Sequence, residues 1–204
     1  MQNDWQAAVI ALPQPKRDGP MSLEAVLARR RSVREFQEKP LDLVIVGQML
    51  WAAQGITGDD GLRTAPSAGA RYPVEAYAVV AQGVFHYRPA DHTLHRITSG
   101  DRRAALASAA LGQPFLAIAP LTLALACVFS RTLARYGETR GMRYVAMDIG
   151  HAAQNALLQA VALNLVSVPV GAFDDDGVRE ALGLPAEHIP LYLLPVGEPA
   201  KPSA

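Results

Sequence analysis

Four arginines lie close together near the start of the chain, in the stretch RRRSVREF (29–36). If this stretch is extended, alternate residues face the same way, so Arg30, Ser32 and Arg34 share one side and Arg31 faces the other. The backbones of Arg30 and Arg34 then stand about 13 Å apart. That separation suits an elongated ligand, with a phosphate held by Arg30 and Ser32 and a polar ring near Arg34. The alternative is a helix whose last turn carries solvated arginines that complement its dipole.

Two other stretches combine residues that let a backbone approach a ligand. TAPSAGARYP places Pro66, Ser67 and Gly69 in one turn-rich loop, and glycine permits close approach. VPVGAF (168–173) places proline and glycine at the end of an apolar strand, where Gly171 can direct a backbone N–H at a ligand. Each stretch taken alone is also typical of an ordinary turn.

The segments around these motifs predict helices first and then strands. Ser22 can cap a helix over residues 23–31, and Asp42 and Gly55 bound a second helix. The connection 55–73 is longer than a simple loop, and such loops usually carry function. Three strands joined by short turns follow as an antiparallel meander over residues 75–97.

The rest of the chain continues the alternation. It predicts a helix over residues 101–111, a buried strand over 120–129, a short helix over 130–137 and a long helix over 142–164. A strand that becomes a turn follows over 166–173, then a helix over 175–183 and a last strand over 189–197. Together the elements predict an α+β fold, with a mostly antiparallel central sheet flanked by helices. Residues 1–20 are expected to run over the surface, and residues 21–204 to form one domain.

The long helix is expected to be buried at the centre of the fold, because residues 145–163 are apolar on most sides. His151, Gln154, Asn155 and Leu158 share one of its faces. We favour polar groups satisfied by neighbouring backbone or by a symmetry mate. No metal site is expected, since that face carries no second histidine or carboxylate at ligand spacing.

The amino-acid composition excludes several classes of protein. The chain has 204 residues, equal numbers of acidic and basic side chains and no net charge, which argues against a nucleic-acid partner. The only cysteine, Cys127, lies in an apolar stretch and predicts a buried thiol in a reducing compartment, hence the cytoplasm. We expect no signal peptide and no membrane span, because Pro120 splits the longest apolar run.

In this order and spacing the motifs resemble the nitroreductase-like flavoprotein superfamily, and within it the SagB-type dehydrogenase branch. The resemblance runs from about Ser22 to Gly197 and rests on the following stretches: RRSVREF, MLWAAQGIT, GLRTAPSAGARYPVEAY, GVFHYRP, RYGETRGMRY, GHAAQN, VPVGAFDD and PLYLLPVG. The run RTAPSAGA followed by YP is the most specific of them. The resemblance implies an FMN-binding fold, with the flavin at a homodimer interface.

The resemblance also implies roles for particular residues. Arg30 and Ser32 match the phosphate ligands, Arg31 the ribityl contact and Arg34 the basic residue near flavin N1 and O2. The loop that lines the flavin corresponds to Pro66, Ser67, Ala68, Gly69 and Ala70. The turn whose backbone N–H reaches flavin N5 corresponds to Pro169, Val170 and Gly171. Related proteins often carry a basic C-terminal tail, for which Lys201 is the one candidate here.

The implied activity is FMN-dependent, ping-pong hydride transfer from NAD(P)H to a nitroaromatic or quinone-like small molecule. A first alternative is a dehydrogenase that oxidises azoline rings in a modified peptide. Such enzymes carry a Lys-Tyr pair where this chain has Arg135 and Tyr136, and an arginine cannot act as a base near neutral pH. Tyr136 remains a candidate proton donor. A second alternative is a flavin-binding protein without catalysis.

Overall fold

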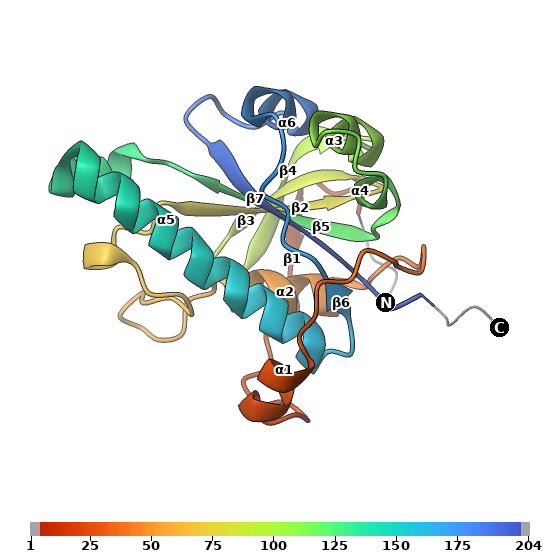
Figure 1. Cartoon of the computed structure of the whole chain (residues 1–204). Coiled ribbons are helices and arrows are strands. Elements are labelled where there is room, and N and C mark those ends of the chain that lie inside the picture. Colours follow the sequence, from red (N-terminus) through yellow and green to blue (C-terminus); the bar gives the residue numbers. More distant parts are fainter. Residues whose placement is uncertain (1–4, 201–204) are drawn as a thin grey trace.

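The computed structural model describes residues 5–200, and its centre is a seven-stranded sheet in which every neighbouring pair of strands is antiparallel (Figure 1). The strands lie in the order β1-β4-β3-β2-β5-β7-β6. Their bounds are Val9–Ala11 (β1), Val74–Val80 (β2), Gly83–Arg88 (β3), Thr93–Ser99 (β4), Leu121–Cys127 (β5), Val166–Ser167 (β6) and Ile189–Gly197 (β7). The predicted α+β class, the meander and the last strand are confirmed.

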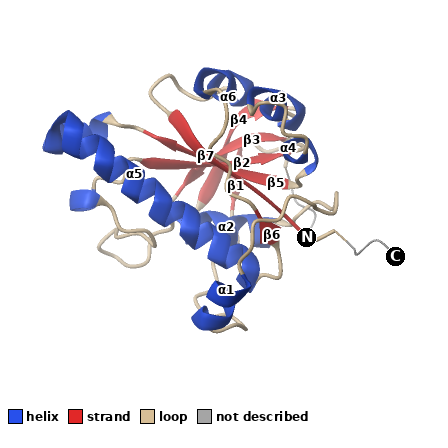
Figure 2. Cartoon of the chain, viewed as in Figure 1, coloured by secondary structure: helices blue, strands red, loops and turns tan. Residues whose placement is uncertain are grey.

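Helices cover both faces of this sheet (Figure 2). Alternate residues of β2 enter different cores. Ala76 and Ala78 face the helices over residues 43–54 and 130–162, and Tyr77 and Val79 face the opposite group of helices. The helices are α1 (Leu23–Arg29), α2 (Leu43–Gln54), α3 (Arg103–Ala109), α4 (Phe115–Ile118), α5 (Ser130–Ala162) and α6 (Asp175–Leu182), with a short 3-10 turn η1 (Ala68–Ala70). Two apolar cores, one on each face, therefore hold the sheet rigid.

Polar caps fix where three helices begin, and two of them are the Ser22 and Asp42 caps that the sequence predicts. The Ser22 hydroxyl accepts a hydrogen bond from the backbone N–H of Ala25, and Asp42 accepts one from Ile45. Asp174 caps α6 in the same way. Each cap satisfies a backbone donor that the helix itself cannot pair. The arginine stretch begins at Arg29, the last residue of α1, and continues directly beyond it.

The long helix α5 extends over the positions for which the sequence predicts two helices. Gly137 breaks its regular geometry with φ 70° and ψ 172°, which only glycine adopts readily. Beyond this break one side of α5 is buried against α2 and the sheet, through Val145, Ile149 and Ala153 among others. The opposite side, which includes Met147, is exposed. The helix is therefore central but buried along one side only.

The N-terminal segment differs from the prediction that it runs over the surface. Val9–Ala11 pairs with β4, and Trp5, Ile10 and Leu12 are buried in the core. Burial of these apolar side chains favours this placement over a path across the surface. Within residues 5–200, no helix is long and apolar enough to cross a membrane.

Candidate functional site

The arginine stretch is an extended segment that lies beside β6. Ser32 pairs in parallel with Ser167, and the Val33 N–H donates to the Ser167 carbonyl over 3.0 Å. Arg30 ends α1, and its N–H still donates to the Val26 carbonyl. The extended conformation expected for residues 32–36 is therefore confirmed.

Alternation sorts the arginine side chains onto two sides. The Arg34 guanidinium lies 5.9 Å from the centroid of the Phe115 ring, whereas Arg31 and Val33 line a shallow hollow beside the end of α5. One Nη atom of Arg31 donates to the carbonyls of Ala28 and Arg30, so this side chain caps the C-terminus of α1.

Three side chains on the other side carry unused hydrogen-bonding groups. Within the described chain, no hydrogen bond or ion pair occupies the side chains of Arg30, Ser32 and Arg34. Arg34 and Ser32 are exposed, and Arg30 is half-buried. Two guanidinium groups without a carboxylate partner suit an anionic ligand.

The turn after β6 lies next to this segment. Val170 exchanges two 2.9 Å backbone hydrogen bonds with Leu193 of β7, which holds the turn against the sheet. Pro169 is half-buried and Gly171 is exposed. Over residues 5–200, the Gly171 N–H meets no acceptor. Its backbone donor is therefore available to a ligand at the same end of the sheet as the arginines.

The turn at residues 66–72 is anchored to the N-terminal part of α5. Gly69, Ala70 and Tyr72 all have positive φ, at 58°, 51° and 46°. Such values cost a residue other than glycine on the order of 1 kcal/mol each and persist only where the surroundings hold them. Pro66, Gly69 and Ala70 are exposed, and Ser67 and Ala68 are half-buried. The turn thus presents exposed backbone from a strained, fixed conformation.

Tyr136 joins this second group. A Cβ atom built on Gly69 would clash with the Tyr136 hydroxyl, so the two residues are in close contact. The Tyr136 ring meets Tyr144 edge-on, with centroids 5.0 Å apart, and the Arg135 guanidinium lies 5.6 Å from the Tyr136 ring centroid. An aromatic pair with a phenol hydroxyl therefore borders the turn.

The two groups lie far apart within one chain. Ser67 contacts Asp148, whereas Arg31 and Val33 share the hollow with Val161, near the other end of α5. The rise of an α-helix puts Asp148 and Val161 about 20 Å apart along α5. One copy of the chain brings the arginine segment to the Gly171 turn but does not bring either to the 66–72 turn.

Comparison with known proteins identifies the family. A sequence profile described as the nitroreductase family matches residues 27–198. The chain belongs to the nitroreductase family. It is 46% identical over 183 residues to a Methanocaldococcus jannaschii protein assigned as a nitroreductase, MJ1384, covering 87% of this chain and 91% of that protein.

Two further proteins are similar to the chain, one as a solved structure and one in sequence. A solved structure from Ralstonia eutropha, also assigned as a nitroreductase, superposes with a TM-score of 0.87 at 29% identity, covering 96% of this chain and 91% of that one. The trifolitoxin-processing protein TfxB of Rhizobium leguminosarum is 34% identical over 119 residues, which cover 53% of this chain and 32% of TfxB.

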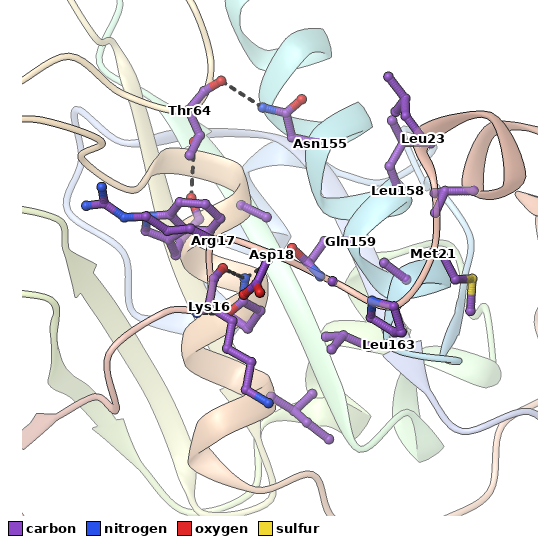
Figure 3. A pocket seen from close by; sticks show the side chains of 18 of the residues that line it. Lys16, Arg17, Asp18, Met21, Leu23, Thr64, Asn155, Leu158, Gln159 and Leu163 are labelled. Atoms are coloured by element: carbon purple, nitrogen blue, oxygen red, sulfur yellow. Dashed lines mark hydrogen bonds between the residues drawn. The ribbon is translucent and has the colours of Figure 1, made fainter.

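This nitroreductase-family chain also contains a cavity of about 610 Å³ that the sequence did not indicate. It lies between the segment 16–23, α2 and the second half of α5, and Figure 3 shows Asn155, Leu158 and Gln159 along its α5 wall. The buried Gln48 amide closes one end by pairing with both backbone groups of Lys16. Among residues 5–200, none of the site residues predicted from the sequence lines this cavity.

The polar face predicted on α5 lies partly on this cavity. The Asn155 amide donates to the Thr64 carbonyl over 3.1 Å, which is the backbone pairing we expected (Figure 3). Leu158 is half-buried, whereas His151 and Gln154 are exposed rather than in the core. These two side chains are therefore left facing outward on a single copy of the chain.

A buried polar network is the main feature of this nitroreductase-family fold that sequence reasoning missed. The Glu75 carboxylate, on β2, pairs with His86 at 2.6 Å and with Arg131 at 2.5 Å. Burial alone would raise the pKa of Glu75, but the hydrogen bond from His86 and the nearby positive charges lower it to about 2. Tyr77, stacked on His86, bonds to His188.

The ligand atoms of Glu75, His86 and His188 lie within 4.8 Å of one another, close enough to consider a metal ion. However, both carboxylate oxygens of Glu75 are already taken by the His86 ring and the Arg131 guanidinium. A fixed guanidinium also opposes a second cation at the same carboxylate. The contacts therefore fit a hydrogen-bond network that joins β2, β3, α5 and the start of β7.

The C-terminal end runs back to the arginine stretch. Phe36 pairs antiparallel with Pro199, and the Ala200 N–H donates to the Glu35 carbonyl over 3.3 Å. The chain therefore leaves the described part beside Glu35 and Arg34. Lys201, a predicted cofactor residue, lies outside the described residues.

Proposed function

We propose that this nitroreductase-family oxidoreductase binds FMN and transfers hydride from NAD(P)H to a nitroaromatic or quinone-like acceptor by a ping-pong mechanism. The observation that carries the proposal is the unpaired set Arg30, Ser32 and Arg34 beside the free N–H of Gly171. Their spacing along an extended segment fits a phosphate at one end and a polar ring at the other.

Each residue has a distinct task in this proposal. Arg30 and Ser32 bind the phosphate through charge-assisted hydrogen bonds. Arg34 places positive charge where the ring becomes negative, and the Gly171 N–H donates a hydrogen bond to the ring edge. FMN, when bound, supplies the hydride acceptor and donor, so no side chain of the protein needs to do so.

Arg31 and Lys201 are weaker members of the proposed site. Arg31 matches the ribityl contact by resemblance, but its guanidinium already caps α1. It could reach a ligand only by giving up those bonds or with its remaining donors. Lys201 is proposed by resemblance alone, and the residues before it, 198–200, run beside Glu35.

A homodimer would complete the site. The 66–72 turn and the arginine segment are separated along α5 in one chain, so a single flavin would meet both only if a second copy supplied one of them. The outer side of α5 is available for that contact, because Met147 on that side is 50% exposed. Leu23 and Val44, at the rim of the cavity beside α5, are also exposed.

Tyr136 is proposed to donate a proton to the acceptor. Its hydroxyl borders the Gly69 turn, and its neighbour Arg135 carries a guanidinium, a group that does not act as a base near neutral pH. The pair can therefore supply a donor and a positive charge, but no base.

The similarity to TfxB, whose name says that it processes trifolitoxin, favours a second candidate. This candidate is oxidation of azoline rings in a modified peptide, as in the SagB-type branch, with oxygen as the final electron acceptor. Arg135 in place of lysine counts against it, since the base is then missing. A non-catalytic flavin-binding protein is the third candidate.

Purified protein separates the three candidates. We expect a yellow protein whose flavin absorbance bleaches rapidly on anaerobic mixing with NADH or NADPH. A protein that stays colourless and binds no added FMN would overturn all three. A yellow protein that does not bleach would favour the azoline dehydrogenase or the non-catalytic protein over the reductase.

A further inference from the structure

The carboxylate of Asp148 is buried in a helix side made mostly of small and aliphatic residues. Asp148 is 4% exposed, and it lies between Val145 and Ala152 on the packed side of α5. Burial raises the pKa of this carboxyl, although hydrogen bonds from Ser67 and from the Ala68 backbone oppose the rise. A leucine there would fill the space without this electrostatic penalty. The choice of aspartate therefore needs a reason other than packing.

Its contacts lead to a single place, the strained turn. The Ser67 hydroxyl donates to Asp148 Oδ2 over 2.6 Å and accepts from the Tyr72 N–H over 2.9 Å. The Ser67 hydroxyl thus links the Asp148 carboxylate to the backbone of Tyr72, a residue with positive φ, through two consecutive hydrogen bonds. The carboxylate, through one hydroxyl, reaches both ends of the segment 67–72.

Hydrogen bonds from Arg131, at the start of α5, fix the same segment from a second direction. The Arg131 guanidinium donates to the Tyr72 carbonyl over 2.9 Å and pairs with Glu75. In return, Arg71 donates from Nε to the Arg131 carbonyl over 3.0 Å. The far side of the turn is therefore fixed to the sheet, and the near side depends on Ser67 and Asp148.

We propose that Asp148 is a positioning residue that acts through Ser67 to hold the 66–72 turn in its strained conformation. The inference rests on the proposed function for its purpose, which is to present the exposed backbone of Gly69 and Ala70 to the flavin. The geometry of the hold is independent of that purpose. Both can therefore be tested separately on the same protein.

Limited trypsin digestion of the FMN-free protein tests the hold directly, because Arg71 is an exposed cleavage site within the turn. We expect Asp148→Ala to speed cleavage after Arg71 by about tenfold, as loss of a hydrogen bond to a charged group opens the turn more often. Asp148→Asn keeps an acceptor for the Ser67 hydroxyl and should restore slow cleavage. Unchanged cleavage in Asp148→Ala would overturn the proposal, whether or not the protein binds FMN.

A double-mutant cycle tests whether Asp148 acts through Ser67. Asp148→Ala should speed cleavage much less in the Ser67→Ala background than in wild type, because only the hydrogen bond from the Ala68 backbone is then left for the second change to remove. If the two effects multiplied instead, Asp148 would act by another route and the proposal would fail.

Titration with FMN tests whether Asp148 also affects cofactor binding. We expect Asp148→Ala to weaken FMN binding about tenfold, with Asp148→Asn close to wild type. Thr98→Ala is the matched control, since it removes a 3.0 Å hydrogen bond to the Leu182 carbonyl far from the turn. It should lower thermal stability without changing FMN affinity or cleavage after Arg71. Wild-type protein that binds no FMN would overturn the proposed function alone, and the cleavage arm would still decide the role of Asp148.

Discussion

The Tyr136 hydroxyl occupies the space that a side chain at Gly69 would need. Gly69→Ala must therefore displace Tyr136 and also force a positive φ on alanine, which costs about 1–2 kcal/mol. We expect lower thermal stability together with slower turnover of a nitroaromatic acceptor. Thermal melts and steady-state kinetics measure the two effects.

Gly61→Ala is the control for that variant. Gly61 has φ 74°, and no atom lies near its built Cβ. It should lose stability like Gly69→Ala but keep the turnover rate. Equal turnover losses in both variants would show that backbone strain, and not the Tyr136 contact, is responsible.

Arg30 and Arg29 should differ sharply in FMN binding. Arg30→Ala removes the proposed charge-assisted hydrogen bond to the phosphate and should weaken FMN binding by roughly 1.5–3 kcal/mol. Arg29→Ala should have little effect, because Arg29 lies within α1 and contacts Met21. Isothermal titration with FMN compares them, and unchanged affinity in Arg30→Ala would remove Arg30 from the site.

Glu75 should control stability in acid. Its ionised form is stabilised in the folded protein, with a pKa lowered from 4.5 to about 2, so its contribution is present above about pH 4.5 and is lost as the pH falls towards 2. That shift corresponds to about 3 kcal/mol near neutral pH. We expect Glu75→Gln to lose about this much at pH 7.

Urea denaturation at several pH values measures that effect. The difference between wild type and Glu75→Gln should shrink as the pH is lowered below 4.5. A difference that stays constant with pH would mean that Glu75 acts through packing and not through its charge.

The outer side of α5 should carry the proposed dimer contact. Met147→Asp places a charge on that side and should shift the protein to a monomer with weaker FMN binding. Leu111→Asp is the control, because Leu111 is 70% exposed after α3, on the opposite face of the sheet. Light scattering coupled to size exclusion reports the mass. A wild-type monomer would contradict the dimer, and a Met147→Asp variant that stayed dimeric would place the contact elsewhere.

Local sequence patterns were enough to predict most elements of the fold. Ser22 and Asp42 set helix starts because a side-chain oxygen must satisfy backbone donors at those positions. The sequence also predicted that the side chains around Ser32 face alternate sides, because the side chains of an extended segment repeat with a period of two. Val9–Ala11 and Phe115–Ile118 were missed because such short elements form only through contacts with distant segments.

For the candidate site, too, some features follow from local sequence and others only from the tertiary structure. The sequence by itself determined which residues are proposed for the site: the arginines, Ser32 and the turn glycines lie in recognisable local patterns, and Tyr136 comes from the resemblance to the family. Only the tertiary structure decided that Arg31 caps α1, that Tyr136 covers Gly69 and that Glu75 and Asp148 are buried with their partners. These contacts join residues far apart in the chain, and local periodicity carries no information about which distant side chains will share a buried space.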